Sequence, residues 1–156
     1  MSGPALIEGD ARAQGLKVAI VAARFNELIV ASLIKGAQGE WLERGGAAAD
    51  LSIVRVPGAF ELPLVAQKLA ASGRYQALVA LGCVIRGDTP HFEYVAGEAA
   101  RGLARAGVET GVPIAFGVLT VETLEQALER AGSGADNKGA EAMASALEMA
   151  AVMAQL

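Results

Sequence analysis

The sequence contains a single cysteine, a single histidine and a single tryptophan among its 156 residues, and aromatic side chains make up only 4% of it. One cysteine excludes an intramolecular disulfide and is typical of proteins in a reducing compartment. We expect Cys83 to be a small buried apolar residue, which is how a free cysteine usually behaves. Because there is no second histidine and no cluster of Cys, Asp or Glu, a metal ion would find too few ligands, and no metal site is predicted.

Blocks of basic residues and long apolar runs are also absent. The formal net charge is -4 and the isoelectric point is near 5.0, so nucleic acid is not an expected partner. The longest apolar stretches, such as ALVALGCVI, are far shorter than the roughly 20 residues that cross a bilayer. The first fifteen residues have neither the basic start nor the apolar centre of a signal peptide. We therefore expect no membrane association and a cytoplasmic location.

Small apolar residues, in contrast, are abundant. Hydrophobic residues make up 53% of the chain and the mean hydropathy is +0.40, although aromatics are scarce. A chain of this length is expected to form one domain, and a small soluble domain needs a polar surface. We therefore expect a sheet that is covered on both faces, with part of the surface buried against other subunits.

Apolar runs typical of strands alternate along the chain with segments in which apolar residues recur at helical spacing. Strands are predicted at 16–23, 50–58, 75–87 and 112–120. Helices are predicted from Asn26 to the glycines at 45 and 46, and at 61–73, 90–106, 121–131 and 137–155. Because each parallel crossover needs a helix, this order predicts an α/β fold with a parallel sheet and helices on both faces.

Three of these segments carry further expectations. The third helix should have Thr89 as its cap and Pro90 at its first position. Residues 1–15 show no periodicity, and they are predicted to be a tail or an edge strand supplied to a neighbouring chain, with 16–156 forming a single domain. The first helix should carry its apolar residues on one face: Leu28, Val30, Leu33, Ile34, Ala37 and Trp41.

Polar and aromatic residues gather where the predicted strands end. In open parallel sheets, ligands bind beyond the carboxyl ends of the strands. We therefore expect one site at this edge, formed by the segments ARFN (23–26), VPGAFE (56–61), IRGDTPH (85–91) and AFGVLT (115–120).

Each candidate residue at this edge has two interpretations. Phe25 and Phe60 could stack on a planar heterocycle or fill the top of the core. Glu61 could accept hydrogen bonds from substrate hydroxyls or merely begin its helix. The N–H groups of Asp88 and Thr89, with the helix dipole, suit a phosphate, although Thr89 could only cap the helix.

The two interpretations of His91 are a proton-transferring group and a solvated residue at a helix start. Arg130 lies just before the turn GSGADNKG (132–139) and Lys138 lies near its end, where they are either anion ligands or solvated charges. This turn is not a P-loop, because Asn precedes its lysine and Ala follows its last glycine. No G-x-G-x-x-G follows a strand, so a dinucleotide cofactor is not indicated.

Taken together, the segments ARFN, VPGAFELP, GCVIRGDTPHFEYV, PIAFGVLT and ERAGSGADNKGAEA closely resemble the lumazine synthases. The match runs from about residue 16 to the C-terminus in the family's order and spacing. The resemblance implies a flavodoxin-like, three-layer α/β/α fold with strand order 2-1-3-4. It also implies a transferase of riboflavin biosynthesis that works without metal or organic cofactor. This enzyme condenses 5-amino-6-(D-ribitylamino)uracil with 3,4-dihydroxy-2-butanone 4-phosphate to 6,7-dimethyl-8-ribityllumazine, releasing phosphate and water.

The resemblance also implies roles for individual residues. Phe25 would stack on the pyrimidine, whose edge would bind the backbone near Val84 and Ile85. Thr89, the amide of Asp88 and Arg130 would bind phosphate, and His91 would move protons. Phe116 and Lys138 would complete the pocket. The ribityl chain would be held by Asn26, Gly58, Ala59, Phe60 and Glu61.

The resemblance further implies a homo-oligomer with shared active sites, in which Phe116, Arg130 and Lys138 come from the adjacent subunit. A homopentamer is expected. A decamer or an icosahedral capsid of sixty chains stays open, because the turn 132–139 is as short as in capsid-forming members but lacks their first lysine. Asp88 stands at a variable position of the family, so only its backbone is expected to matter. Two alternatives remain, an archaeal-type riboflavin synthase of similar fold and a non-catalytic flavin-binding or shell-forming relative.

Overall fold

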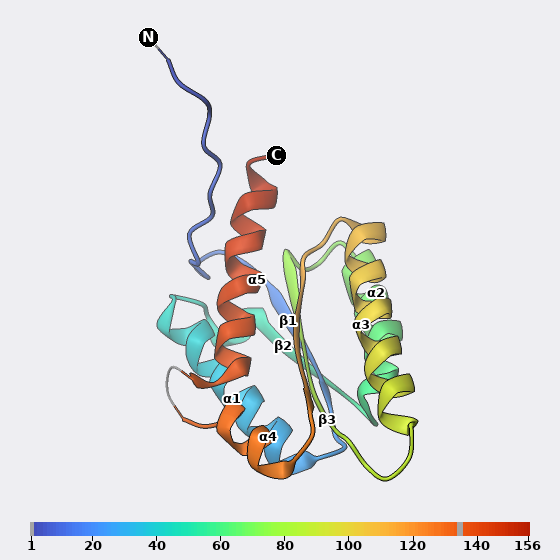
Figure 1. The fold of residues 1–156 in the computed structure, drawn as a ribbon. Helices are drawn as coiled ribbons and strands as arrows, with labels where there is room; N and C mark the ends of the chain where they lie inside the picture. Colours follow the sequence, from blue (N-terminus) through green and yellow to red (C-terminus); the bar gives the residue numbers. More distant parts are fainter. Residues whose placement is uncertain (1, 134–135) are drawn as a thin grey trace.

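The computed structural model describes residues 2–133 and 136–156, and these form three layers around one parallel sheet (Figure 1). The turn at 132–139 contains the two undescribed positions 134 and 135, so the expectation that rests on its missing lysine lies partly outside the described residues. The sheet has the order β2-β1-β3-β4. Its strands are β1 (Val18–Ala23), β2 (Leu51–Val56), β3 (Ala77–Ile85) and β4 (Ile114–Val121). Each lies within its predicted range or within one residue of it.

Helices cover both faces of this sheet. The helices α2 (Leu62–Ala71) and α3 (His91–Thr110) lie on one face, and α1 (Glu27–Glu43), α4 (Leu124–Arg130) and α5 (Lys138–Ala154) lie on the other (Figure 1). The predicted flavodoxin-like α/β fold with strand order 2-1-3-4 is therefore confirmed. Parallel strands run in the same direction, so the carboxyl ends of all four strands lie at one edge.

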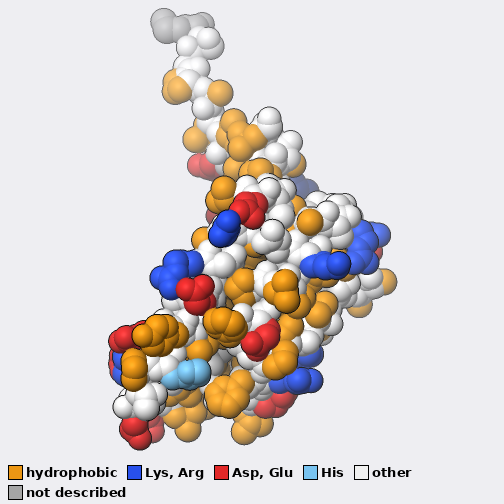
Figure 2. All heavy atoms as spheres, turned by 90° about the vertical axis from the view of Figure 1, so that its right-hand side faces the viewer, with side chains coloured by type: hydrophobic (Ala, Val, Ile, Leu, Met, Phe, Trp, Pro, Cys, Tyr) orange, Lys and Arg blue, Asp and Glu red, His pale blue; other side chains and the backbone are white. Residues whose placement is uncertain are grey.

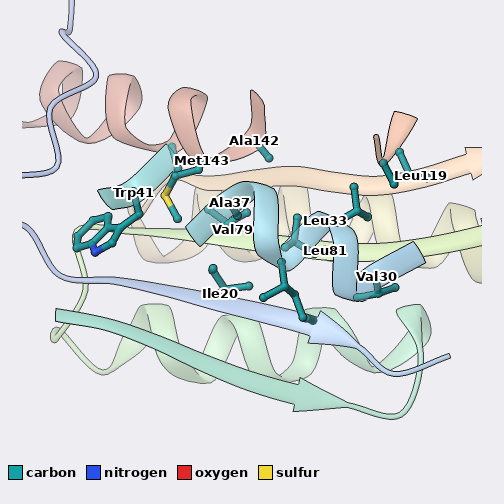
Figure 3. Close-up of a cluster of buried hydrophobic side chains, with 14 of the residues drawn as sticks. Ile20, Val30, Leu33, Ala37, Trp41, Val79, Leu81, Leu119, Ala142 and Met143 are labelled. Carbon is teal, nitrogen blue, oxygen red and sulfur yellow. The ribbon is translucent and has the colours of Figure 1, made fainter. Parts of the chain in front are cut away.

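The side chains of the central strand β1 alternate between the two cores. Ile20 packs into the core under α1 and α5, whereas Val21 packs into the core under α2 and α3. All six β1 residues are buried, which explains why the strand appears in the sequence as an unbroken apolar run rather than an alternating one. Figure 3 shows the larger core, where Trp41, Leu33 and Met143 lie between α1, α5 and the sheet.

The first helix buries a different face at its start from the one predicted. Leu28 is 85% exposed, while Ile29 and Val30 are buried. Residues two positions apart on a helix point in different directions, so Leu28 cannot share the face that carries Val30 and Ile34. The other predicted members of the apolar face are buried as expected.

The boundaries of α3 and α4 also differ from the prediction. Pro90, rather than Thr89, occupies the cap position of α3, and no side chain caps this helix. The helix continues four residues beyond 106 to Thr110, and Gly111 ends it with φ +73. The helix α4 begins at Leu124 instead of 121, because Val121 still pairs with Ile85 in the sheet.

The described part of the N-terminal segment forms no strand within this chain. It runs along the C-terminal part of α5, where the Gln155 side chain donates a hydrogen bond to the Glu8 carbonyl at 2.6 Å. A side chain at Gly9 would meet the Glu148 carbonyl oxygen at 2.1 Å, so this contact requires a glycine. The expectation that residues 1–15 add a strand to a neighbouring chain stays a prediction.

None of the helices within residues 2–133 and 136–156 has the combination of length and apolar composition that crossing a membrane requires.

Candidate active site

An open cavity of about 710 Å³ lies at the carboxyl ends of β1, β2 and β3, beside the start of α3. We call it the strand-end cavity. Figure 2 views the molecule from the side of α2 and α3 and shows the histidine at the surface among apolar side chains. The cavity is lined by Phe25, Pro57, Gly58, Ala59, Phe60, Glu61, Cys83, Val84, Ile85, Gly87, Thr89, His91, Phe92, Tyr94 and Val95.

Hydrogen bonds beyond the end of β1 hold Phe25 at the rim of this cavity. The Phe25 N–H donates to the Pro57 carbonyl at 3.0 Å, which joins the end of β1 to the end of β2. Asn26 has a left-handed backbone with φ +64, and its side-chain amide donates to the Cys83 carbonyl at 2.7 Å. The backbone therefore turns sharply after Phe25 and leaves its ring 72% exposed.

The segment after β2 places an aromatic ring and a carboxylate on the same cavity. A 3-10 turn over Ala59–Glu61 follows Gly58, and the Glu61 N–H donates to the Gly58 carbonyl at 3.2 Å. Ala59 is buried, while Phe60 is 57% exposed. Among the described residues, the Glu61 carboxylate has no salt bridge or side-chain hydrogen bond, so it is available to a ligand. A Cβ at Gly58 would lie 3.3 Å from this carboxylate and crowd it.

The last residues of β3 expose backbone polar groups to the cavity. Strand β1 pairs with β3 only as far as Leu81, whereas β4 pairs with it as far as Ile85. Backbone groups alternate sides along a strand, and the Cys83 carbonyl points toward the β1 side, where it accepts from Asn26. The N–H and C=O of Ile85 therefore face the same side, beyond the last residue that pairs with β1.

The start of α3 places Thr89 and His91 on the cavity, and both are exposed. Tyr94 and Val95 line the same cavity, and no site role was predicted for them. They follow His91 at i+3 and i+4, so their position on the same helix face as His91 could have been found from the sequence. Asn26 and Asp88, both predicted site residues, lie next to lining residues but are not among the described residues that line the cavity.

Arg86, for which no site role was predicted, fixes the first turn of α3. Its guanidinium forms salt bridges with Glu122 at 2.9 Å and Glu93 at 3.2 Å, and it lies 4.4 Å from the centre of the Phe92 ring. Hydrogen bonds to these carboxylates, that to Glu122 foremost, raise the pKa of Arg86 above its ordinary value. The side chain therefore stays cationic and ties the start of α3 to the end of β4.

The remaining predicted residues do not lie in the strand-end cavity. Phe116, Arg130 and Lys138 line a second cavity of about 350 Å³ between the outer strand β4 and the helices α4 and α5. We call it the β4-edge cavity. Its other lining residues are Ala115, Gly117, Val118, Leu119, Thr120, Val121, Glu141, Ala142 and Ser145. The described lining residues of the two cavities have no member in common.

Both cations of the β4-edge cavity are held by nearby groups of the same chain. The Arg130 guanidinium donates to the Gln126 carbonyl at 3.0 Å and lies 3.8 Å from the Glu129 carboxylate. The Lys138 ammonium lies 2.9 Å from the Glu141 carboxylate. These side chains are partly exposed, so an anion in the cavity can compete for them.

Cys83 contributes to the wall of the strand-end cavity without being a nucleophile. Its side chain is buried, as predicted, and burial raises the pKa of the thiol to about 11. The thiol is therefore neutral near pH 7, and the thiolate is the reactive form. Within residues 2–133 and 136–156, no group of three or more His, Cys, Asp or Glu side chains could hold a metal ion.

The chain is similar to proteins of known family along almost its whole length. The family model described as 6,7-dimethyl-8-ribityllumazine synthase matches residues 15–154. A relative from Nitratidesulfovibrio vulgaris strain Miyazaki F is 57% identical over 150 residues, covering 96% of each chain. A relative from strain DP4 is 60% identical over 151 residues, again covering 96% of each chain. Both relatives are named 6,7-dimethyl-8-ribityllumazine synthase.

Proposed function

Because the chain belongs to the 6,7-dimethyl-8-ribityllumazine synthase family, an enzyme family of riboflavin biosynthesis, we propose that it catalyses the reaction of that name. It condenses 5-amino-6-(D-ribitylamino)uracil with 3,4-dihydroxy-2-butanone 4-phosphate to 6,7-dimethyl-8-ribityllumazine and releases phosphate and water. We expect this reaction to take place in the cytoplasm and to need no metal or organic cofactor.

The observation that carries this proposal is the strand-end cavity with its exposed aromatic rings, open backbone groups and free carboxylate. The pyrimidine stacks on Phe25, whose ring is 72% exposed at the rim. The ring's edge binds the backbone of Val84 and Ile85, and the groups of Ile85 face the side that β1 leaves open. The ribityl hydroxyls bind Asn26, Gly58, Ala59, Phe60 and Glu61.

The phosphate of the second substrate binds at the start of α3, against the Thr89 hydroxyl and the amide of Asp88. The positive end of the helix dipole favours an anion at this position. His91 begins the same helix, so its imidazole lies beside the leaving phosphate and can accept and return protons. Arg130 supplies the countercharge from the β4-edge cavity of an adjacent chain, where Phe116 and Lys138 complete the pocket.

This division of the site supports a closed homo-oligomer, for which we propose a pentamer. Each chain carries both cavities, and its β4 side exposes apolar residues that an isolated chain would leave in water, including Phe116 at 48%, Leu124 at 51% and Leu128 at 55%. We expect residues 16–156 to act as one domain, and residues 1–15 to be a tail or an edge strand supplied to a neighbouring chain. A decamer or a capsid of sixty chains would add contacts between such rings.

The reaction depends more on holding the two substrates in the right orientation than on a strong acid or base. The amine of the pyrimidine attacks the ketone carbon and water leaves, phosphate is then lost by elimination, and the ring closes with loss of water. Each step moves a proton, which His91 can carry, but two substrates must first be held together. We expect most of the rate acceleration to come from this alignment.

The test mixes the purified protein with both substrates and follows lumazine fluorescence. The expected result is product that depends on the protein and on both substrates, and that falls sharply in the Phe25→Ala/His91→Ala variant. A riboflavin synthase would instead convert added lumazine to riboflavin, and a non-catalytic relative would bind flavin or lumazine without turnover. If the protein forms no lumazine when both substrates are present, the proposal is wrong.

A further inference from the structure

Asn137 is the one buried polar side chain in the part of the chain that the structure describes, with a relative exposure of 4%. It lies at the start of α5, directly before Lys138 and after the turn that follows α4. The motifs at the strand ends do not include it.

The Asn137 side chain connects three helices through both of its polar atoms. Its Nδ2 donates to the carbonyls of Gly132 at 2.9 Å and Ser32 at 3.1 Å, with that of Ala131 at 3.4 Å. Its Oδ1 accepts from the N–H groups of Gly139 at 2.8 Å and Ala140 at 3.0 Å. The amide therefore joins the end of α4 and the start of α5 to α1.

Two glycines leave the space that this side chain fills. A Cβ at Gly36 of α1 would lie 2.1 Å from Asn137 Oδ1, and a Cβ at Gly139 would lie 2.0 Å from the Leu33 carbonyl oxygen. The helices α1 and α5 thus approach each other closely around the amide. Leu33, which directly follows the hydrogen-bonded Ser32, is fully buried, so packing in the core holds this part of α1 in place.

We propose that Asn137 is a positioning residue for the anion site, because it fixes the two cations of the β4-edge cavity relative to each other. Arg130 directly precedes Ala131, whose carbonyl the amide contacts, and Lys138 directly follows Asn137. A shift of this amide moves both cations. The inference rests on the proposed function, in which Arg130 supplies the countercharge to the phosphate of the second substrate and Lys138 completes the pocket beside it.

Only asparagine has the chemistry and size for this position. The site needs one acceptor for two N–H groups and a donor for the carbonyls around Nδ2. Aspartate keeps the acceptor, and it is a good helix cap, but its ionised carboxylate cannot donate and would face carbonyl oxygens. When protonated, it regains a single donor.

The test compares the wild type with Asn137→Asp in the assembled protein. We expect KM for the butanone phosphate and the inhibition constant of inorganic phosphate to rise roughly tenfold or more, while KM for the pyrimidine changes less than about twofold. The phosphate affinity of the variant, divided by that of the wild type at the same pH, should rise toward one as the pH falls from 8 to 5.5. Protonation of the new carboxyl restores a hydrogen-bond donor there. Native mass spectrometry checks that the assembly is unchanged.

A matched control separates positioning from loss of stability. Trp41→Phe removes another hydrogen bond of α1 that is partly buried, the 2.9 Å bond from the indole N–H to the Ala47 carbonyl. This variant should lower Tm without a selective change in phosphate affinity. If Asn137→Asp behaves in the same way, or raises both KM values equally, the positioning role is wrong.

Two further measurements keep the inference testable whatever the activity. If the wild type forms no lumazine, the proposed function fails. Calorimetry then still measures the affinity for inorganic phosphate, which should be lower in Arg130→Ala and in Asn137→Asp than in the wild type. Absence of phosphate binding by the wild type would overturn the inference as well. If Asn137→Asp does not fold, Gly36→Ala displaces the same amide from the α1 side and should give the same selective loss, whereas unchanged phosphate affinity would contradict the inference.

Discussion

Two variants of low activity should regain activity when they assemble together, if each active site combines the strand-end cavity of one chain with the β4-edge cavity of the next. The first variant, Phe25→Ala with His91→Ala, damages only the strand-end cavity. The second, Arg130→Ala, damages only the β4-edge cavity. Because the two cavities have no described lining residue in common, each variant keeps one cavity intact.

The expected recovery follows from the geometry of a closed ring. In rings assembled at random from equal amounts of the two variants, an intact strand-end cavity meets an intact β4-edge cavity at roughly a quarter of the junctions. Arg130→Ala alone should lose tenfold to a hundredfold of activity at limiting butanone phosphate, since a charge-assisted pair contributes about 1.5–3 kcal/mol. Without exchange, the mixture should therefore show about 5% of wild-type activity or less.

The assay unfolds both variants together, refolds them and measures lumazine formation. Native mass spectrometry confirms that the rings contain both variants, and parents mixed after separate refolding serve as the control. The co-assembled rings should approach a quarter of wild-type activity, well above that control. Rings that are mixed in composition but no more active than their parents would show that the site lies within one chain.

Two further predictions concern single side chains of the strand-end cavity. His91→Ala should lower kcat by roughly tenfold to a hundredfold, because the imidazole moves protons while alignment supplies most of the rate; an unchanged kcat between pH 6 and 8 would make His91 structural. Burial raises the pKa of Cys83 from 9.0 to about 11, so the folded chain holds the thiol proton more tightly than the unfolded chain does. The resulting stability is complete below pH 9 and is lost as the pH rises through 11. Denaturant unfolding should show a free-energy advantage of the wild type over Cys83→Ala that shrinks across this range, and a constant or growing advantage would contradict it.

The strands were the most predictable part of the fold, because both faces of the sheet are covered and the buried strands are unbroken apolar runs. Helix ends were less predictable. Thr89-Pro90 has the sequence of a capped helix start, yet the helix begins at His91 with Pro90 in the cap position. Leu28 fits the composition of the apolar face but not its direction, which depends on where the helix begins.

The topology explains which parts of the site could be predicted. Parallel strands bring their carboxyl ends to one edge, so the residues around Phe25, Phe60 and His91 were expected to meet, and they line one cavity. The fourth expected segment, 115–120, does not join them and lines the β4-edge cavity of the same chain instead. The roles of Arg86 and Asn137 depend on distant partners instead. Asn137 has the local sequence of a helix cap, but its hydrogen bond to Ser32 spans 105 residues of sequence and only the folded chain shows it.

The path of the two chain ends has a practical value for attaching this protein to something else. The described N-terminal segment and the end of α5 both leave the domain on the side opposite the carboxyl ends of the strands (Figure 1). Gln155 and Glu8 bond to each other there. A purification tag, a fluorescent protein or a linker to a sensor surface, joined at either end, would therefore project away from the strand-end cavity.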